Sequence, residues 1–307
     1  MAACGGSQPS APTAPPAPPT LDTNVAAGTV FGVVSGETGE AIVGAQVVLA
    51  GRRYDTDSIG QISLIEPVPY GATVDVIAPT FFDRQTLLRR NGTRRFVLWP
   101  RSTPWGLFES YTAELVYTYA TSEPPPVGTS PLWRIRQNTR EAVVIVSDEI
   151  RAAAHAYEAH QVAVGHLNAA LDGKITYALS PTRPTTGVVF ETRVDPADPV
   201  CADRVLGYAR MSSQSGEIVS GHVVYCSLDQ VNASLVGHEL GHTMGLQHAP
   251  DGRDLMHPFI RPGRERFSRA ESLILNMLFE RPGGNRFPDN DRDAAAAASG
   301  QRISICY

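Results

Sequence analysis

Lysine is almost absent from this chain, and that scarcity limits the partners it can have. Lys174 is the only lysine among 307 residues, so arginine carries nearly all the positive charge. The formal net charge is −5, and no run of three basic residues occurs. Binding to nucleic acid or to an anionic membrane surface depends on clustered Lys and Arg side chains. We therefore predict no nucleic-acid partner.

Long apolar runs and paired cysteine motifs are also missing. No stretch approaches the ~20 apolar residues that a membrane-spanning helix needs. The four cysteines include no CxxC pair, which excludes a zinc ribbon built on cysteines. Cys201 and Cys226 could close a loop of about 25 residues, a disulfide worth roughly 3 kcal/mol that requires an oxidising compartment. Two buried free thiols are the alternative.

The first residues have little that could build a core. A tract rich in Pro, Ala, Ser and Thr follows Cys4, so residues 1–27 are predicted to be an extended, disordered tether. Small residues before a cysteine and a tether after it are similar to the end of a bacterial lipoprotein signal, although no charged and apolar regions precede Cys4. Cys4 is therefore either the lipid-bearing residue of a membrane tether or a stray cysteine. The first alternative predicts an extracytoplasmic protein, in the bacterial cell envelope or secreted.

Residues 28–100 have the pattern of a small antiparallel β-sandwich. Short segments rich in β-branched residues alternate with turn signals, and no helical periodicity separates them. The predicted strands are 29–34, 45–49, 61–64, 73–77 and 95–98. The Gly and Asp placements in 41–47 and 56–60 resemble the carboxypeptidase regulatory-like (transthyretin-like) β-sandwich. That resemblance implies a structural or adhesive accessory module without catalytic residues.

Residues 105–285 instead predict an α+β domain, followed by a C-terminal tail at 286–307. The predicted elements are a buried strand at 142–146, a helix from the Ser147 cap to Leu171, strands at 188–192, 206–211 and 218–225, a helix starting near Leu228 behind a capping box at Ser227, and a helix opening at Ser268. On the first of these helices, His155 and His166 are expected on the solvated face. His160, at its flank, is given no role.

One stretch near residue 240 has the spacing of a metal site. His238 and His242 stand one helical turn apart on the same face and can both reach one zinc ion. Glu239 is poorly angled to ligate but can hold a water on the metal. Gly245 permits the left-handed turn that reverses the chain, so that His248 returns as a third ligand. Three imidazoles leave one coordination position open, so we predict a single, catalytic Zn²⁺.

The run 238–248 resembles the metzincin clan of zinc endopeptidases, and the segment 254–258 resembles the Met-turn of that clan. The resemblance implies a twisted, mostly parallel sheet, a long active-site helix, and Met256 beneath the metal without ligating it. Within the clan the matrixins look closest, because they also place Pro two residues after Met. Pro258 stands where astacin-like enzymes have a zinc-binding tyrosine. Val224 stands near a ligand of the second matrixin zinc, so no second zinc is predicted, and no cysteine-switch propeptide is visible.

These residues predict a zinc metalloendopeptidase that acts on proteins or peptides. Glu239 would serve as the general base for the water that attacks the peptide carbonyl. The substrate is expected to pair with an edge strand at 206–211. Residues 257–262 are expected to wall the pocket for the side chain after the cut.

Two alternatives remain open at this level. The acidic clusters at 195–198 and 289–293 could hold Ca²⁺, but neither has a regular ligand spacing, so solvated loops are favoured. A surface binding or adhesion lipoprotein with a non-catalytic zinc site is the rival function. Glu239 favours the enzyme, because a purely structural zinc site needs no carboxylate beside its first histidine.

Overall fold

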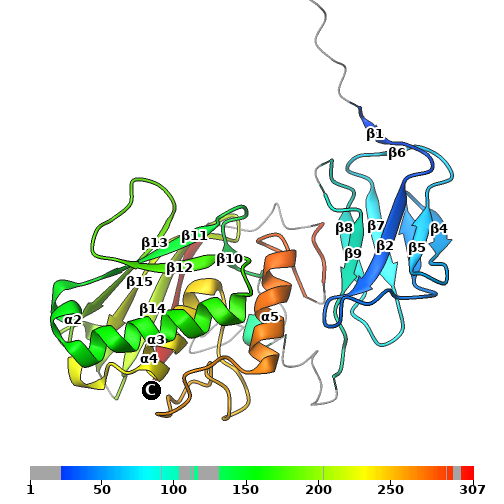
Figure 1. Ribbon diagram of the computed structural model, residues 1–307. Coiled ribbons are helices and arrows are strands. Elements are labelled where there is room, and N and C mark those ends of the chain that lie inside the picture. The colour runs from blue at the N-terminus through cyan, green and yellow to red at the C-terminus, as the bar shows by residue number, and fades with distance from the viewer. Residues whose placement is uncertain are drawn as a thin grey trace, which may run out of the picture.

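The computed structural model describes residues 22–90, 92–103, 112, 114–116, 131–202, 204–287, 289–292 and 299–307. They form two units that lie side by side, with helix α5 (Arg269–Glu280) between them (Figure 1). Cys4 lies outside the described residues. The predicted tether extends too far, because Asn24–Val25 (β1) pairs with Val68–Pro69 (β6) and Val25 is buried. Within the described part of the chain, no helix is long and apolar enough to span a bilayer.

The N-terminal unit consists mainly of two sheets that share one hydrophobic cluster. The first has the order β5-β2-β9 and the second the order β4-β3-β7-β8. Their bounds are Val30–Ser35 (β2), Gln46–Leu49 (β3), Arg52–Asp55 (β4), Gln61–Ser63 (β5), Thr73–Ile77 (β7), Arg84–Leu87 (β8) and Arg95–Leu98 (β9). Alternate side chains along β2 and β3 are buried, which directs one face of each sheet inward.

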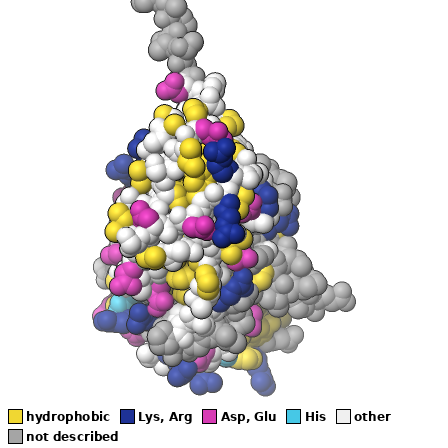
Figure 2. Space-filling view, turned by 90° about the vertical axis from the view of Figure 1, so that its right-hand side faces the viewer, with side chains coloured by type: hydrophobic (Ala, Val, Ile, Leu, Met, Phe, Trp, Pro, Cys, Tyr) yellow, Lys and Arg dark blue, Asp and Glu magenta, His cyan; other side chains and the backbone are white. Residues whose placement is uncertain are grey.

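The prediction of a purely antiparallel unit is wrong at one pair. Strand β9 runs parallel to β2, whereas every other named strand pair of the two sheets is antiparallel. The chain reaches β9 by crossing from β8 in the opposite sheet, so it enters beside β2 in the same direction. Acidic, basic and hydrophobic side chains are mixed over the face that this unit presents in Figure 2, with no stripe of one charge among the described residues drawn there.

The second unit is built on one mixed sheet of seven strands, in the order β12-β11-β13-β15-β14-β16 with β10 also paired to β15. The strands are Arg134–Ile135 (β10), Glu141–Val146 (β11), Thr176–Ser180 (β12), Val188–Val194 (β13), Gly207–Gln214 (β14), Glu217–Tyr225 (β15) and Gly300–Cys306 (β16). Only the pairs β14–β15 and β14–β16 are antiparallel. Strand β16 belongs to the segment predicted as a tail, but it joins the sheet, and alternate side chains over its last five residues are buried there.

The first helix predicted in this unit is interrupted. It divides into Asp148–Ala152 (α2) and Ala154–Leu171 (α3), because Ala153 has an extended backbone. The predicted cap is also wrong, since the Ser147 side chain makes no cap hydrogen bond. The inward face of α3 is formed by Ala156, Ala159, His160, Ala163, Val164, Leu167 and Leu171. His160 is consequently fully buried, where its Nδ1 lies 2.8 Å from the carbonyl of Ala156 and its Nε2 3.2 Å from the Tyr225 hydroxyl. The prediction of a flanking His160 is therefore wrong.

The second predicted helix begins later than its sequence suggests. Leu228–Gln230 forms only a 3₁₀ turn, and Ser227 makes no side-chain cap bond. The helix α4 runs from Ala233 to Met244, capped by Asn232, whose side chain accepts a hydrogen bond from the Leu235 N–H at 3.1 Å. The predicted Ser268 cap of α5 is confirmed as a capping box.

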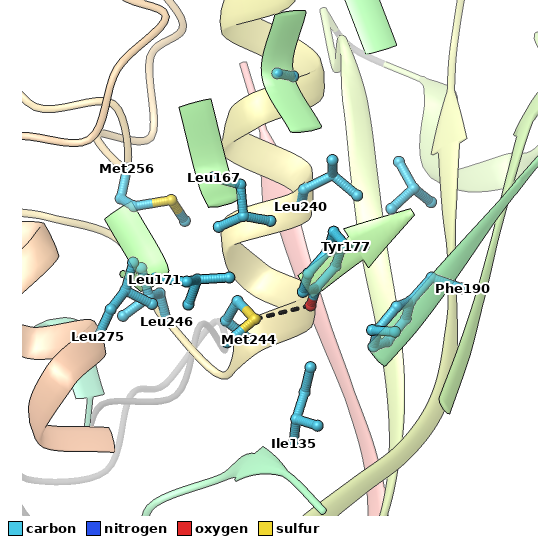
Figure 3. Packing of buried hydrophobic residues seen from close by; sticks show 14 of the residues in the cluster. Ile135, Leu167, Leu171, Tyr177, Phe190, Leu240, Met244, Leu246, Met256 and Leu275 are labelled. Atoms are coloured by element: carbon cyan, nitrogen blue, oxygen red, sulfur yellow. Dashed lines mark hydrogen bonds between the residues drawn. The ribbon is translucent and has the colours of Figure 1, made fainter. Parts of the chain in front are cut away.

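Buried side chains hold α4 between α3 and the sheet. Leu240 and Met244 of α4 lie near Leu167 and Leu171 of α3 (Figure 3). The hydroxyl of Tyr177, on β12, donates to Met244 Sδ at 2.8 Å. Because every residue of α4 is buried, its rotation about its own axis is fixed, and so are the directions of its histidines.

A buried cluster of charges joins the two units. Arg84 on β8 bonds to Asp289 at 2.6 Å and to Asp291, while Arg281 after α5 bonds to the Asp289 carboxylate at 2.7 and 2.8 Å. The pKa of Asp289 is lowered despite its burial, because Arg281 and Arg84 face it. Asp289 and Asp291, predicted to lie in a solvated loop, therefore hold the junction between the units. Asp293 lies outside the described residues.

Asp289→Ala should lower the free energy of unfolding by about 3–5 kcal/mol, because it removes the carboxylate paired with the buried Arg281 and one of the two that face Arg84. The exposed pair Arg52–Glu66 offers a matched control, and Glu66→Ala should cost less than about 1 kcal/mol. Urea denaturation of both variants beside the parent measures the difference. Equal shifts of the two midpoints would contradict a stabilising role for the buried cluster.

Candidate metal centre

Helix α4 brings two histidines to the same point. His238 and His242 are fully buried, and their Nε2 atoms are 3.0 Å apart. The helix then ends at Gly245, whose φ of 107° is the left-handed conformation predicted for it. The chain reverses there and brings His248 back, with ring centroids 5.4 Å from His238 and 5.0 Å from His242. The three predicted ligands therefore meet in one place.

Backbone carbonyls determine which ring nitrogen of each helix histidine faces the centre. Nδ1 of His238 lies 2.7 Å from the carbonyl oxygen of Leu255, and Nδ1 of His242 lies 2.9 Å from that of Leu246. A carbonyl can only accept, so each Nδ1 carries the proton and each Nε2 presents a lone pair. Burial lowers the pKa of His238 to about 3 and that of His248 to about 4, which keeps both rings neutral near pH 7.

These atoms fit a zinc ion. Two lone pairs facing each other at 3.0 Å are unfavourable unless a cation lies between them, and Nε2 of the mostly buried His248 has no hydrogen-bond partner. Tetrahedral zinc with bonds of 2.0–2.1 Å places two nitrogen ligands roughly 3.3 Å apart. The observed separation of the His238 and His242 nitrogens agrees within a few tenths of an ångström.

A fourth candidate ligand, not predicted from the sequence, comes from β16. The Sγ atom of Cys306 is fully buried and lies 3.8 Å from Nε2 of His242. Ligand atoms of Cys306 and the three histidines all lie within 4.8 Å of one another. A sulfur and a nitrogen on one tetrahedral zinc would be roughly 3.6 Å apart. The alternation Ile303, Ser304, Ile305, Cys306 was the available signal, since it marks a strand with Cys306 on one face.

Glu239 points into the same space from the next position of α4. It is fully buried, and neither carboxylate oxygen has a hydrogen-bond partner. Burial raises the pKa of Glu239 to about 8. The Cys306 thiol faces this carboxyl and lowers the pKa slightly, although the two do not meet the geometry of a hydrogen bond. A Cβ atom on Gly207 would lie 3.2 Å from Oε1 of Glu239, so the carboxyl lies against the start of β14.

Met256 lies beside the histidines without entering the ligand cluster. A Cβ atom on Gly241, the residue before His242, would collide with the Met256 sulfur, so the two are packed as closely as glycine allows. The backbone N–H of Met256 donates to Glu271 on α5 at 2.7 Å, and its carbonyl accepts from the Ala249 N–H at 2.8 Å. Both bonds hold the loop that carries His248 and the Leu255 carbonyl.

The strand expected to bind substrate is not a free edge. Strand β16 pairs antiparallel with β14 along its length, from Gly207 opposite Cys306 to Ser213 opposite Gly300. On the other side, Tyr307 exchanges backbone hydrogen bonds with the 257–262 segment, accepting from Ile260 at 2.8 Å and donating to Pro258 at 3.0 Å. The space predicted for a peptide is thus filled by the chain itself.

A disulfide closes the loop that leads into β14. Cys201 and Cys226 are bonded, with their Cα atoms 5.2 Å apart. In the other predicted acidic cluster, the Asp198 carboxylate accepts hydrogen bonds from the Val200 N–H and from the Tyr208 hydroxyl at 2.7 Å. Both oxygens of the Asp198 carboxylate are therefore used in hydrogen bonds within the protein. No feature of the described residues in this cluster indicates Ca²⁺.

Comparison with known proteins assigns part of the chain to a family. Residues 137–272, which include the histidine motif, match the matrixin family (Peptidase_M10). The chain contains a matrixin-like domain. Metalloproteinase-II from Bacteroides fragilis is a similar solved structure, with 11% identity over 80% of this chain and 98% of that chain and a TM-score of 0.31. No curated protein matches the chain. The match covers neither β16 nor the N-terminal unit of this matrixin-like protein.

Gly245→Ala should destabilise the matrixin-like domain by clearly more than the about 1–2 kcal/mol of a left-handed alanine. The added Cβ would also run into the carbonyl oxygen of Trp133. Gly173→Ala is the matched control, because Gly173 has a φ of 74° with open space around it. Urea midpoints would show the difference, and equal losses would mean that the packing against Trp133 is irrelevant.

Proposed function

We propose that this protein is a zinc-dependent endopeptidase with His238, His242 and His248 as metal ligands and Glu239 as the general base. The observation that carries the proposal is the position of Glu239. A buried carboxylate without any hydrogen-bond partner is costly, and proteins retain such groups where chemistry uses them. Here it lies beside three neutral imidazoles whose lone pairs converge. The matrixin match supports the same activity.

Lewis acidity is the chemistry that zinc supplies to such a site when bound, towards both a water molecule and a peptide carbonyl. Glu239 then takes the proton of the attacking water and returns it to the leaving amine. Burial raises the pKa of Glu239, and a higher pKa makes its ionised form a stronger base towards the water proton. Met256 supports the histidines by filling the space against Gly241, as the Met-turn resemblance implies.

The substrate would be an extended peptide bound along β14. Main-chain pairing with a strand tolerates many side chains, which suits a protein or peptide substrate. Phe259 is 59% exposed in the segment expected to wall the pocket after the cut. This exposed aromatic favours apolar residues at that position of the substrate.

The disulfide between Cys201 and Cys226 supports work in an oxidising, extracytoplasmic compartment. Attachment to the cell envelope through a lipid on Cys4 belongs to the same proposal. The rival function, a surface binding or adhesion lipoprotein, draws on Val43, Ile59 and Ile65, which are exposed on the N-terminal unit. Single exposed apolar residues are common on soluble proteins, so this support is the weaker.

One zinc ion per chain is the expected metal content of the purified protein near neutral pH. His248→Ala should weaken zinc binding strongly, because it removes one of three imidazoles. His155→Ala, on the exposed part of α3, is the matched control and should bind as the parent does. Metal analysis after dialysis and a competition titration measure both values. A His248→Ala protein with parental zinc affinity would contradict the ligand set.

Glu239→Gln should keep the zinc and the fold while it removes the general base, lowering peptide cleavage by about 10²–10⁴-fold. His238→Ala should instead lose metal and activity together. Cleavage of a quenched fluorescent peptide is measured with long incubation, in the full chain and in a chain ending at Ser299. The second chain is included because β16 covers β14. Cleavage by Glu239→Gln at the parental rate, or none by either parental chain, would overturn the peptidase proposal.

A further inference from the structure

We propose that β16 is a built-in inhibitor of the matrixin-like domain, in which Cys306 supplies the fourth metal ligand and the strand fills the substrate-binding edge. The inference rests on the proposed endopeptidase function and names how that site is regulated. The matrixin match ends at residue 272, well before β16 begins. The observations that carry it are the pairing of β16, the position of the thiol and the contacts of Tyr307.

The backbone of β16 is bound as an extended peptide would be. Its seven residues pair in register with β14, and the Leu206 N–H donates to the Cys306 carbonyl at 3.0 Å. Tyr307 then continues into backbone hydrogen bonds with Pro258 and Ile260 on the opposite side. A strand that is hydrogen-bonded to both walls uses the groups that recognise a substrate main chain, so peptide and β16 exclude each other.

The side chain of Cys306 occupies the centre of that groove. Arg302, Ser304 and Cys306 form the buried face of β16, so the register that pairs Cys306 with Gly207 also directs its thiol inward. There the sulfur joins the three imidazoles and faces Glu239. A catalytic zinc site keeps one position open for water or substrate, and a thiolate donor closes it. Glu239 then has no water to activate.

This arrangement differs from a purely structural zinc site in two respects. A structural site with three histidines and one cysteine would give Glu239 no role. Its burial without a hydrogen-bond partner would then only lower the stability of the fold. Moreover, β16 pairs with a single strand of the sheet among the described residues. It can therefore leave by breaking this one ladder and the two backbone hydrogen bonds of Tyr307, with the other strand pairs of the sheet intact.

The test uses the full chain with Cys4→Ser, so that Cys306 is the one thiol outside the disulfide. Cobalt(II) replaces zinc as the probe, because a cobalt–thiolate bond gives a charge-transfer absorption that cobalt bound only by imidazoles lacks. Cys306→Ser is compared with Ser304→Ala, a control on the same face of β16. A chain ending at Ser299 removes the whole strand. Thermal melting of each protein shows whether it is folded, and the point variant keeps the test decisive if the shortened chain unfolds.

We expect the charge-transfer band in the Cys4→Ser parent and in Ser304→Ala, and its loss in Cys306→Ser. The Cys306 thiol should resist 5,5′-dithiobis(2-nitrobenzoate) while metal is bound and react after chelation. With zinc, Cys306→Ser should cleave a quenched fluorescent peptide roughly tenfold faster than the Cys4→Ser parent, because it removes the thiolate that closes the open metal position while β16 stays in place. The chain ending at Ser299 should be faster still.

Each contrary result identifies what has failed. A metal-bound parent without the band, whose thiol reacts freely, would overturn the ligand role of Cys306. A parent that cleaves the peptide as fast as Cys306→Ser and the shortened chain would overturn the inhibition and leave the endopeptidase proposal standing. A band in the parent with no cleavage by any variant would overturn both, because the site would then be structural.

Discussion

The structure depends most on two backbone carbonyls that each accept a hydrogen bond from a buried imidazole. The Leu255 and Leu246 oxygens hold the N–H sides of His238 and His242, which leaves both lone pairs directed at the same point. Those carbonyls are in place only because the chain reverses at Gly245 and because Glu271 on α5 accepts from the Met256 N–H. The loops that supply these two carbonyls therefore belong to the metal centre, because they orient its histidine ligands.

The position of α4 links this centre to the rest of the domain. Apolar side chains on α3 and the hydroxyl of Tyr177 fix the helix from behind. The junction of Arg84, Arg281 and Asp289 fixes the far end of α5, which in turn holds Met256. Packing, buried ion pairs and ligand geometry thus form one connected network, and Phe82 and Trp99 of the N-terminal unit belong to the same hydrophobic cluster as α4.

Local signals predicted much of this arrangement. The spacing of His238, His242 and His248, the left-handed Gly245 and the Ser268 cap each depend on residues close in sequence, and each is found where it was expected. What could not be predicted depends on distant segments. His160 is buried against Tyr225, 65 positions later in the chain, and Asp289 is paired by an arginine 205 positions earlier.

The largest difference between sequence and structure has the same cause. Cys306 is separated from His242 by 64 positions, so no local pattern relates them. The strand expected to form a free edge at 206–211 is present as β14 and pairs with β15. Its other edge is not free, because β16 pairs with it. Hydrophobic periodicity shows that a segment is a strand and does not show which edge it will join.

The buried junction also determines how far β16 can travel. Asp291 is held against β8, and eight residues separate it from Gly300. A fully extended chain advances at most ~3.6 Å per residue, so Gly300 of a detached β16 would stay within roughly 30 Å of Asp291. Opening alone would then be brief, since the strand remains at high local concentration. A lasting change of state would require the chain between Asp291 and Gly300 to be cut, or Cys306 to be altered. The length of this connection therefore determines how easily β16 returns to its groove.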